Sequence, residues 1–291
     1  MGKIRIVVDS AADFPSSSMI HRHGIVVVPQ RIDFGAESYL ERVEMDAESY
    51  SRHISRDDLP VPKIISPTVE QYTEVYTRLA YDTDKVISLH HSRAMGSSWD
   101  NAKIASQSVM GRCDVAVIDS KTTSAGLGML AELAAQAVEQ GESYDEAVRM
   151  VRGAVSRTYC IFYVDTLKTI QRHGLIGEAQ AVLGAMLGIK PFLTIEDGVL
   201  LTMEKVRSRA QAVDKLVEYV AEFETIDKLI IVQNSPFTTE AVRILQDRLA
   251  AHLSRRNFPA LLYGPTLASF LGPDATGLFI LEGEEEEEDD F

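Results

Sequence analysis

Short apolar runs alternate with longer amphipathic segments through the first half of this chain, and this alternation constrains the fold more than any other feature. Four runs have the composition of buried strands, at residues 4–8, 25–28, 86–89 and 115–118. Apolar residues recur at helical spacing in three segments between or after them, at 69–79, 102–110 and 127–138. Because successive parallel strands are joined by helical crossovers, this order predicts a largely parallel sheet.

The second half of the chain has a different pattern and predicts a mixed α/β arrangement. Asp197-Gly198 separates two strand-like runs. This dipeptide supplies the positive φ angles of a type I′ turn, so it predicts a β-hairpin. Further elements are expected around the hairpin, with strands at 159–164, 229–232, 261–263 and 278–281 and helices at 210–223 and 239–253.

Chain length and local charge divide the sequence further. A chain of 291 residues is long for a single core. We predict an N-terminal α/β domain at residues 1–157, a C-terminal α/β domain at 158–281 and a disordered acidic tail at 282–291. The tail contains eight acidic residues that repel one another, and it has no apolar residue before Phe291.

Composition disfavours several classes of partner and location. The formal net charge of −14 argues against nucleic acid or an anionic membrane surface as a partner. No apolar stretch reaches the length of a membrane span, and the first residues enter a strand pattern without a signal-peptide core. Cys113 and Cys160 lie in apolar runs, which indicates buried thiols. We therefore expect a cytoplasmic protein without a stable membrane anchor.

Polar loops follow three of the predicted strands. They begin at Asp9, at Arg93 and at Asp119, and they are rich in Ser, Thr and Asp. Ligands collect at the carboxyl ends of strands in parallel α/β sheets, so these loops could converge on one site. The alternative is that each Ser or Asp only caps the helix that follows it.

The familiar signatures of catalysis are missing from the sequence. It has neither the GxSxG elbow of serine hydrolases nor the GxxxxGK[ST] loop that binds phosphates. His90 and His91 are adjacent on a predicted strand and point to opposite faces, so a structural pair is favoured over a metal site. We predict no catalytic residue, no metal and no cofactor.

Several segments together resemble one known family. They are VDSAADFP at 8–15, GIVVVPQRIDFGAESY at 24–39, PKIISPTVEQY at 62–72, RAMGSSWDNA at 93–102, VIDSKTTSAGLG at 117–128, GIKPFLTIEDGVL at 188–200, EKVRSRAQA at 204–212 and YGPTLASFLGPDATG at 263–277. In this order and spacing they resemble the DegV family of bacterial fatty-acid-binding proteins. The likeness covers nearly the whole chain except the acidic tail.

The resemblance implies two α/β domains with a long-chain fatty acid buried between layers of the fold. Such a protein presents the carboxylate of the acid to a separate fatty acid kinase, and is a carrier rather than an enzyme. Three alternatives stay open. The chain could be a lipid-binding paralogue with an altered head-group site, an interacting paralogue with a collapsed cavity, or a small-molecule enzyme that uses the loops at Asp9 and Asp119.

The resemblance also implies a set of ligand-contacting positions, several of which depart from the family pattern. The set is Ile64, Ile65, Ser66, Gly96, Ser97, Ser98, Arg207 and Phe270. The family's Lys-Thr-Ser-Gln-Pro reads Lys63-Ile64-Ile65-Ser66-Pro67, so two hydroxyls have become isoleucines. Its Leu-Ser-Gly-Thr reads Met95-Gly96-Ser97-Ser98, which exchanges serine and glycine. A family histidine reads Phe270, a Gly-Gly-Arg element reads His173-Gly174-Leu175, and Arg207 keeps the basic position.

We expect the turn RAMGSSWDNA to be the N-terminus of a helix that also receives a polar head group. Ser97 suits an N-cap, and free backbone N–H groups at a helix start favour an anion. Gly96 would let a ligand approach the backbone closely. The competing interpretation is that Ser97 only caps the helix and Gly96 only makes the turn. Residues 179–187 could form a wall of the acyl tunnel, although the same pattern fits an ordinary buried helix.

Overall fold

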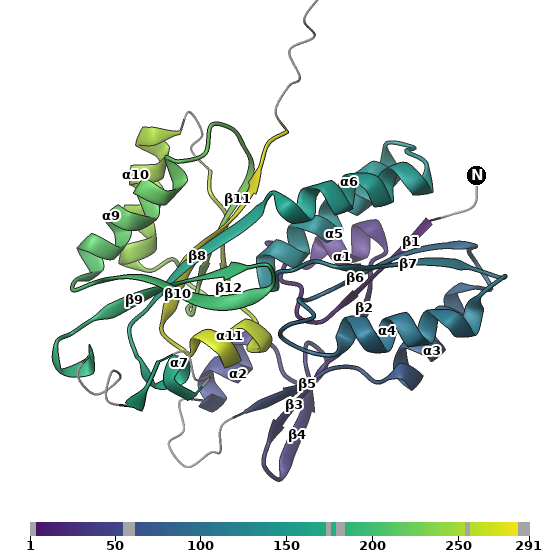
Figure 1. Cartoon of the computed structure of the whole chain (residues 1–291), viewed down its shortest axis with the longest axis horizontal. Coiled ribbons are helices and arrows are strands. Elements are labelled where there is room, and N and C mark those ends of the chain that lie inside the picture. Colours follow the sequence, from purple (N-terminus) through teal and green to yellow (C-terminus); the bar gives the residue numbers. More distant parts are fainter. Residues whose placement is uncertain (1–3, 55–61, 173–175, 179–183, 254–256, 285–291) are drawn as a thin grey trace, which may run out of the picture.

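The protein is an α/β molecule built on three sheets (Figure 1). Its architecture comes from a computed structural model of the full chain, which describes residues 4–54, 62–172, 176–178, 184–253 and 257–284. The predicted fold class, with a parallel N-terminal sheet and a mixed C-terminal sheet, is confirmed. The division into domains at residue 157 stays a prediction.

The N-terminal sheet is fully parallel and has the strand order β2-β1-β6-β7. Its strands are β1 Ile4–Asp9, β2 Val26–Val28, β6 Lys85–His90 and β7 Asp114–Asp119. Side chains alternate between its two faces. Val7 packs towards Tyr72 and Tyr76, whereas Ile6 and Val8 join a core on the opposite face. Both faces are therefore covered, as the alternation of strands and helices predicted.

Helices cover the two faces of this sheet. One face is covered by α3 Val69–Leu79, by α4 Ser98–Ser106 and by the 3-10 turn Gln107–Val109. The other face is covered by α1 Ser18–His23, α5 Ser124–Glu139 and α6 Tyr144–Ser156. Helix α3 matches its predicted bounds because Thr68 and Gln71 form a reciprocal capping box. Ser143 caps α6 by accepting a hydrogen bond from the backbone N–H of Glu146.

The C-terminal sheet has six strands in the order β10-β9-β8-β13-β11-β12. They are β8 Thr158–Val164, β9 Lys190–Glu196, β10 Val199–Val206, β11 Ile226–Gln233, β12 Ala260–Leu262 and β13 Ala275–Glu282. The predicted hairpin is confirmed: Asp197 and Gly198 have φ angles of 49° and 84° and join β9 to β10. Glu282, predicted as the start of the tail, is instead the last residue of β13, and residues 285–291 lie outside the described part of the chain.

A small third sheet was not predicted. It is antiparallel, has the order β4-β3-β5, and consists of β3 Arg31–Phe34, β4 Glu37–Leu40 and β5 Lys63–Ile65. Its strands have three or four residues, too few for a recognisable alternation. The sheet matters for function because β5 carries the segment that begins the predicted head-group site.

The remaining helices complete the C-terminal half and the region between the sheets. They are α2 Ala47–Ile54, α7 Lys168–Arg172, α9 Arg209–Val220, α10 Glu240–His252 and α11 Pro265–Leu271. Helix α11 contacts α2, α7 and β5, and Figure 1 shows it between α7 and the small sheet. Segments from distant parts of the sequence are thereby brought into one region.

One apolar core runs from the parallel sheet to the six-stranded sheet. Helix α5 lies between them: it contacts β1 and β6 on one side and β8, β11 and β13 on the other. Its glycines permit this close packing, because a Cβ at Gly126 would lie 3.0 Å from the Phe279 ring and a Cβ at Gly128 would lie 2.0 Å from the Asp13 carbonyl oxygen. Close packing against these two neighbours therefore explains the glycines at 126 and 128.

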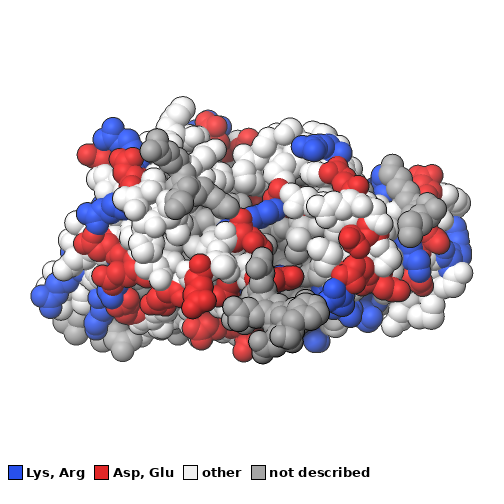
Figure 2. Space-filling view, turned by 90° about the horizontal axis from the view of Figure 1, so that it is seen from above, with Lys and Arg blue, Asp and Glu red and all other residues white. Residues whose placement is uncertain are grey.

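The surface reflects the net charge of −14. Figure 2 shows one face of the molecule, on which acidic side chains are spread widely and basic side chains form smaller groups among them. Among the described residues, no helix is both long enough and apolar enough to cross a bilayer.

Candidate functional site

The loops that follow β1, β6 and β7 meet at the carboxyl edge of the parallel sheet. Ser92 donates its backbone N–H to the Thr122 carbonyl at 2.7 Å, and Ser120 donates its backbone N–H to the His90 carbonyl at 3.1 Å. Asp13 donates its backbone N–H to the Ser124 carbonyl at 3.0 Å. The three polar loops therefore converge, which is one of the two arrangements that the sequence left open.

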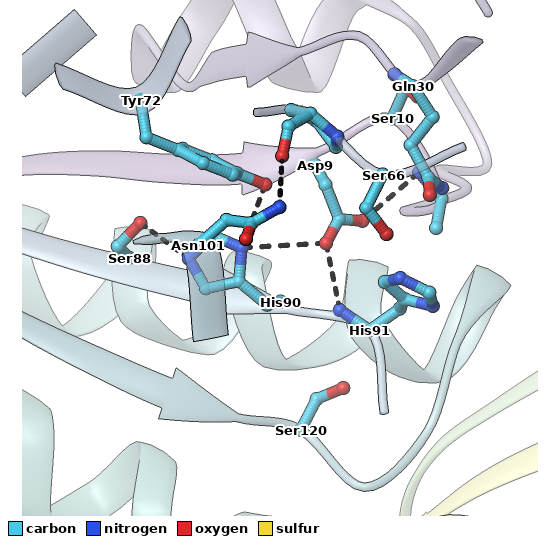
Figure 3. Close-up of polar contacts among 12 residues, drawn as sticks. Asp9, Ser10, Gln30, Ser66, Tyr72, Ser88, His90, His91, Asn101 and Ser120 are labelled. Atoms are coloured by element: carbon cyan, nitrogen blue, oxygen red, sulfur yellow. Dashed lines mark hydrogen bonds and ion pairs between the residues drawn. The ribbon is translucent and has the colours of Figure 1, made fainter. Parts of the chain in front are cut away.

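Asp9 lies at the centre of this edge and is completely buried (Figure 3). Its carboxylate accepts the backbone N–H of His91 at 3.0 Å and lies 3.5 Å from Nδ1 of His90. Burial raises the pKa of Asp9, but the neighbouring His91 and His90 outweigh it and hold that pKa below its ordinary value. The Asp9 carboxylate is thus a buried anion that organises the loop after β6.

The two adjacent histidines have different environments. Figure 3 shows their rings on opposite sides of the Asp9 carboxylate. His90 is held by the Tyr72 hydroxyl at 3.3 Å and by the Ser88 hydroxyl at 2.9 Å, which fits the structural role that we predicted. His91 is only 2 % exposed, yet neither of its ring nitrogens has a hydrogen-bond partner among the described residues. The structural interpretation therefore accounts for one histidine of the pair.

His91, Gly96 and Ser66 come together in space. A Cβ placed on Gly96 would lie 2.7 Å from Nε2 of His91 and 2.9 Å from the Ser66 hydroxyl oxygen. The Ser66 hydroxyl in turn accepts the backbone N–H of Ser97 at 3.0 Å. The segment after β5 is thus joined to the turn before α4, as the resemblance implied for the head-group region.

Ser97 and Ser98 differ from the expectation for an N-cap with a ligand-facing hydroxyl. Ser97 occupies the N-cap position of α4, but its side chain makes no capping hydrogen bond, so the predicted side-chain cap is wrong. Its backbone has φ −101° and ψ 10°, outside the extended conformation typical of caps. Ser98 is completely buried and faces Tyr72 on the helical layer. The helix start contributes backbone groups here rather than a serine cap.

The two isoleucines that replace family hydroxyls lie on β5 and point in opposite directions. Ile64 packs against the core that joins the two large sheets, whereas Ile65 is 36 % exposed. Met95 and Phe270 are half-buried and pack against the same core as Ile64. Ile64 and Met95 therefore place apolar side chains close in sequence to Ser66 and Gly96, and Phe270 packs against the same core.

Two other positions that the resemblance singled out do not join this group: one lies elsewhere on the molecule, and one lies outside the described residues. Arg207 is exposed after the end of β10, and no contact joins it to Ser66 or Gly96 among the described residues. Residues 173–175, which replace the family's Gly-Gly-Arg element, are outside the described part of the chain. Most of the candidate tunnel wall at 179–187 is also outside it.

Helix α11 is held in place by two buried carboxylates that the sequence did not point to. Asp13 accepts the backbone N–H of Gly264 at 2.9 Å, and Glu41 accepts that of Thr266 at 3.0 Å. Glu41 also accepts hydrogen bonds from the hydroxyls of Ser10 and Thr266. Burial raises the pKa of Glu41 to about 7. These contacts fix Phe270, which lies on α11, relative to the N-terminal half.

An open pocket of about 750 Å³ lies beside α7. Its lining includes Leu167, Ile176, Leu187, Pro191 and Met203. Leu167 and Ile176 also belong to the core that contains Phe270, and α7 contacts α11 directly. Apolar side chains therefore connect the surroundings of Ser66 with this pocket, although none of the predicted head-group residues lines it.

The carboxylates of Asp9 and Asp119 accept hydrogen bonds from backbone N–H groups of the loops. Oδ1 of Asp119 accepts the backbone N–H groups of Lys121 and Arg93 at 2.9 and 3.3 Å. One Asp9 oxygen accepts the N–H of Ala11 at 3.2 Å while the other accepts that of His91. In the described part of the chain, no group of three or more acidic, histidine or cysteine side chains could hold a metal ion.

The fold and the site define a class of α/β protein. A parallel sheet and a mixed sheet pack through a shared apolar core, and polar loops meet beside that core. The chain belongs to the DegV family, whose model, described as an uncharacterised protein family, matches residues 3–283. A DegV domain-containing protein of Caldanaerobacter subterraneus subsp. tengcongensis is 30% identical, over 97% of this chain and 100% of the relative.

Solved structures of family members have the same fold. A DegV family protein from Thermus thermophilus, described for its fatty acid binding, superposes with a TM-score of 0.83 at 26% identity. DegV of Bacillus subtilis, described as a fatty acid binding protein, also superposes with a TM-score of 0.83, at 25% identity. Each match covers 97% of this chain and 100% of the other.

Proposed function

We propose that this protein binds a long-chain fatty acid and presents its carboxyl group to a separate kinase. One observation carries the proposal: the buried His91 and the half-buried Ser66 and Gly96 come together just after β5, the strand that carries Ile64 and that the Phe270 helix α11 contacts. A ligand with one polar end and a long apolar body matches this combination. The fatty acid binding of the family members from Thermus thermophilus and Bacillus subtilis supports the same conclusion.

We infer that the acyl chain runs from Ser66 past Phe270 towards the pocket beside α7. The contact of α11 with both β5 and α7 supports this path. Burial of each methylene contributes roughly 0.8 kcal/mol, so a chain of about sixteen carbons gains enough to offset the cost of ordering it. The charged end needs hydrogen-bond donors, because an unpaired carboxylate is costly to bury.

The kinase step rests on family resemblance and on what this chain lacks in sequence. A fatty acid carrier needs no nucleotide loop of its own, and no GxxxxGK[ST] motif occurs in the sequence. The two cysteines are free and buried, which supports a reducing, cytoplasmic location, where a soluble kinase and ATP are present. The proposed product is an acyl phosphate.

Native mass spectrometry and titration test the binding half of the proposal. Freshly purified protein should carry a mass in the fatty-acid range, and the delipidated protein should bind palmitic acid at a ratio of one to one. A protein that is consistently empty and does not bind palmitic acid would overturn the proposal and favour a collapsed cavity.

The kinase half has its own experiment. Loaded protein, ATP and the catalytic subunit of a bacterial fatty acid kinase should together yield acyl phosphate, detected as its hydroxamate. Omission of either protein should abolish the product. Binding of palmitic acid without any product would leave a lipid carrier and reject presentation to this kinase.

The enzyme alternative has less support. Asp9 is completely buried, and its oxygens accept backbone hydrogen bonds. Asp119 likewise binds backbone N–H groups of its own loop and of the loop after β6. We therefore assign both aspartates to loop structure.

A further inference from the structure

His91 is a buried polar side chain that the protein itself does not satisfy. The residue is 2 % exposed, and both ring nitrogens lack a hydrogen-bond partner among the described residues. A buried polar group that is left unpaired is destabilising, so such groups point to a role beyond packing. The ring lies on the Ser66 side of the β6 end, away from the contacts that hold His90.

The glycine at position 96 is explained by this ring. A Cβ at residue 96 would lie 2.6 Å from Cε1 and 2.7 Å from Nε2 of His91, closer than side chains tolerate. Gly96 does not have a positive φ angle, so its backbone conformation does not itself require glycine. The imidazole therefore fills the space that a side chain at position 96 would occupy.

We propose that the His91 imidazole receives the carboxyl end of the bound fatty acid, in the place of a hydroxyl at position 96. This inference rests on the proposed function and names the residue that determines head-group preference. Nε2 and the Ser66 hydroxyl lie 2.7 and 2.9 Å from the same point, which a residue-96 side chain would otherwise occupy. The two groups can therefore contact one carboxyl group together.

The charged groups around His91 affect whether a proton is taken up when the acid binds. Asp9 on β1, Asp119 on β7 and His90 on β6 are the titratable groups that act on it. Burial lowers the pKa of His91, against the opposite effect of the Asp9 and Asp119 carboxylates. Bringing a second carboxylate close to the ionised Asp9 favours uptake of one proton from solvent by the ring or the ligand. Palmitate binding near pH 8 should therefore take up a proton.

The test compares palmitic acid with methyl palmitate, whose ester cannot ionise. Wild-type protein should prefer the acid, and His91→Ala should reduce the ratio of the two affinities by about tenfold or more. Calorimetry in buffers of different ionisation enthalpy should show proton uptake in the wild type and its loss in His91→Ala. His21→Ala removes an exposed histidine of α1 and should change neither quantity.

A second pair of variants keeps the test independent of folding defects. Gly96→Ser alone should bind palmitic acid poorly, because its side chain meets the imidazole. His91→Ala/Gly96→Ser frees that space and should regain preference for the acid without proton uptake. This rescue would not follow from a purely structural role.

The outcomes separate the two proposals. A wild-type protein that does not bind palmitic acid contradicts the proposed function itself. Wild-type binding combined with an unchanged acid-to-ester ratio in His91→Ala overturns only the assignment of His91. Equal proton uptake in the wild type and in His91→Ala would also overturn the assignment of His91.

Discussion

At the scale of single residues, the site depends on polar groups whose partners come from distant segments. Ser66 accepts the backbone N–H of Ser97, 31 positions further along the chain. Glu41 binds Thr266, which is 225 positions away. These contacts explain why isolated motifs described the site incompletely: a hydroxyl or carboxylate in a loop does not reveal which N–H group it meets.

Ser66→Ala tests the link between the segment after β5 and the turn before α4. The substitution leaves the Ser97 N–H without its acceptor, so we expect a loss of about 1 kcal/mol in unfolding free energy and weaker binding of palmitic acid. Ser97→Ala is the matched control, because its side chain makes no capping hydrogen bond. Urea unfolding and titration measure both effects, and equal behaviour of the two variants would contradict the assignment.

Glu41 gives a pH-dependent prediction. Its pKa is raised from 4.5 to about 7, so between these values the folded protein holds a proton that the unfolded chain has lost. Stability contributed by this group is thus complete below pH 4.5 and is lost as the pH rises through about 7. Glu41→Gln should gain about 2–3 kcal/mol relative to wild type between pH 5 and pH 8. Parallel stability profiles of the two proteins would show that Glu41 has an ordinary pKa.

At the scale of elements, signals that act within a few residues predicted turns and helix bounds. Pairings between segments far apart in the sequence could not be predicted in this way. The Asp197-Gly198 hairpin and the bounds of α3 followed from turn and capping chemistry, which acts within a few residues. The small sheet could not be predicted in this way, because β3 pairs with β5, a strand far along the chain from it. The role that we propose for His91 was also missed, although the glycine at position 96 was a visible signal.

The β9–β10 turn docks on the loops of the parallel sheet and should be sensitive to substitution. Ser92 donates its hydroxyl to the Gly198 carbonyl at 2.6 Å, and Lys121 pairs with Asp197 at 2.8 Å. A Cβ at Gly198 would meet the Ser92 hydroxyl. Gly198→Ala should therefore destabilise the protein by about 2 kcal/mol or more, from strain plus the clash.

Gly188→Ala separates these two causes. Gly188 has a similar positive φ of 63°, but no atom lies within 4 Å of the point where its Cβ would stand, so only backbone strain remains. We expect its cost to be about 1 kcal/mol, clearly below that of Gly198→Ala. Thermal unfolding of both variants gives the comparison, and equal costs would mean that the turn does not dock on Ser92.

At the scale of the whole molecule, the shared core couples the two large sheets. Leu127 on α5 is completely buried between them. Leu127→Ala should cost about 2–5 kcal/mol and weaken both sheets together, whereas Ile104→Ala, on the exposed side of α4, should cost little. Fluorescence of Trp99 and hydrogen exchange in β11 should report one common transition. Two separated transitions would indicate that the predicted domains unfold independently.

The most direct test of the central claim is a crystal structure of the protein with 16-bromohexadecanoic acid, whose bromine marks the end of the chain. Our account predicts the carboxyl group within hydrogen-bond distance of Ser66 and His91, and the bromine near Leu167 and Ile176 beside α7. An acid bound in the reverse direction, or bound without contact to Ser66 or His91, would contradict it.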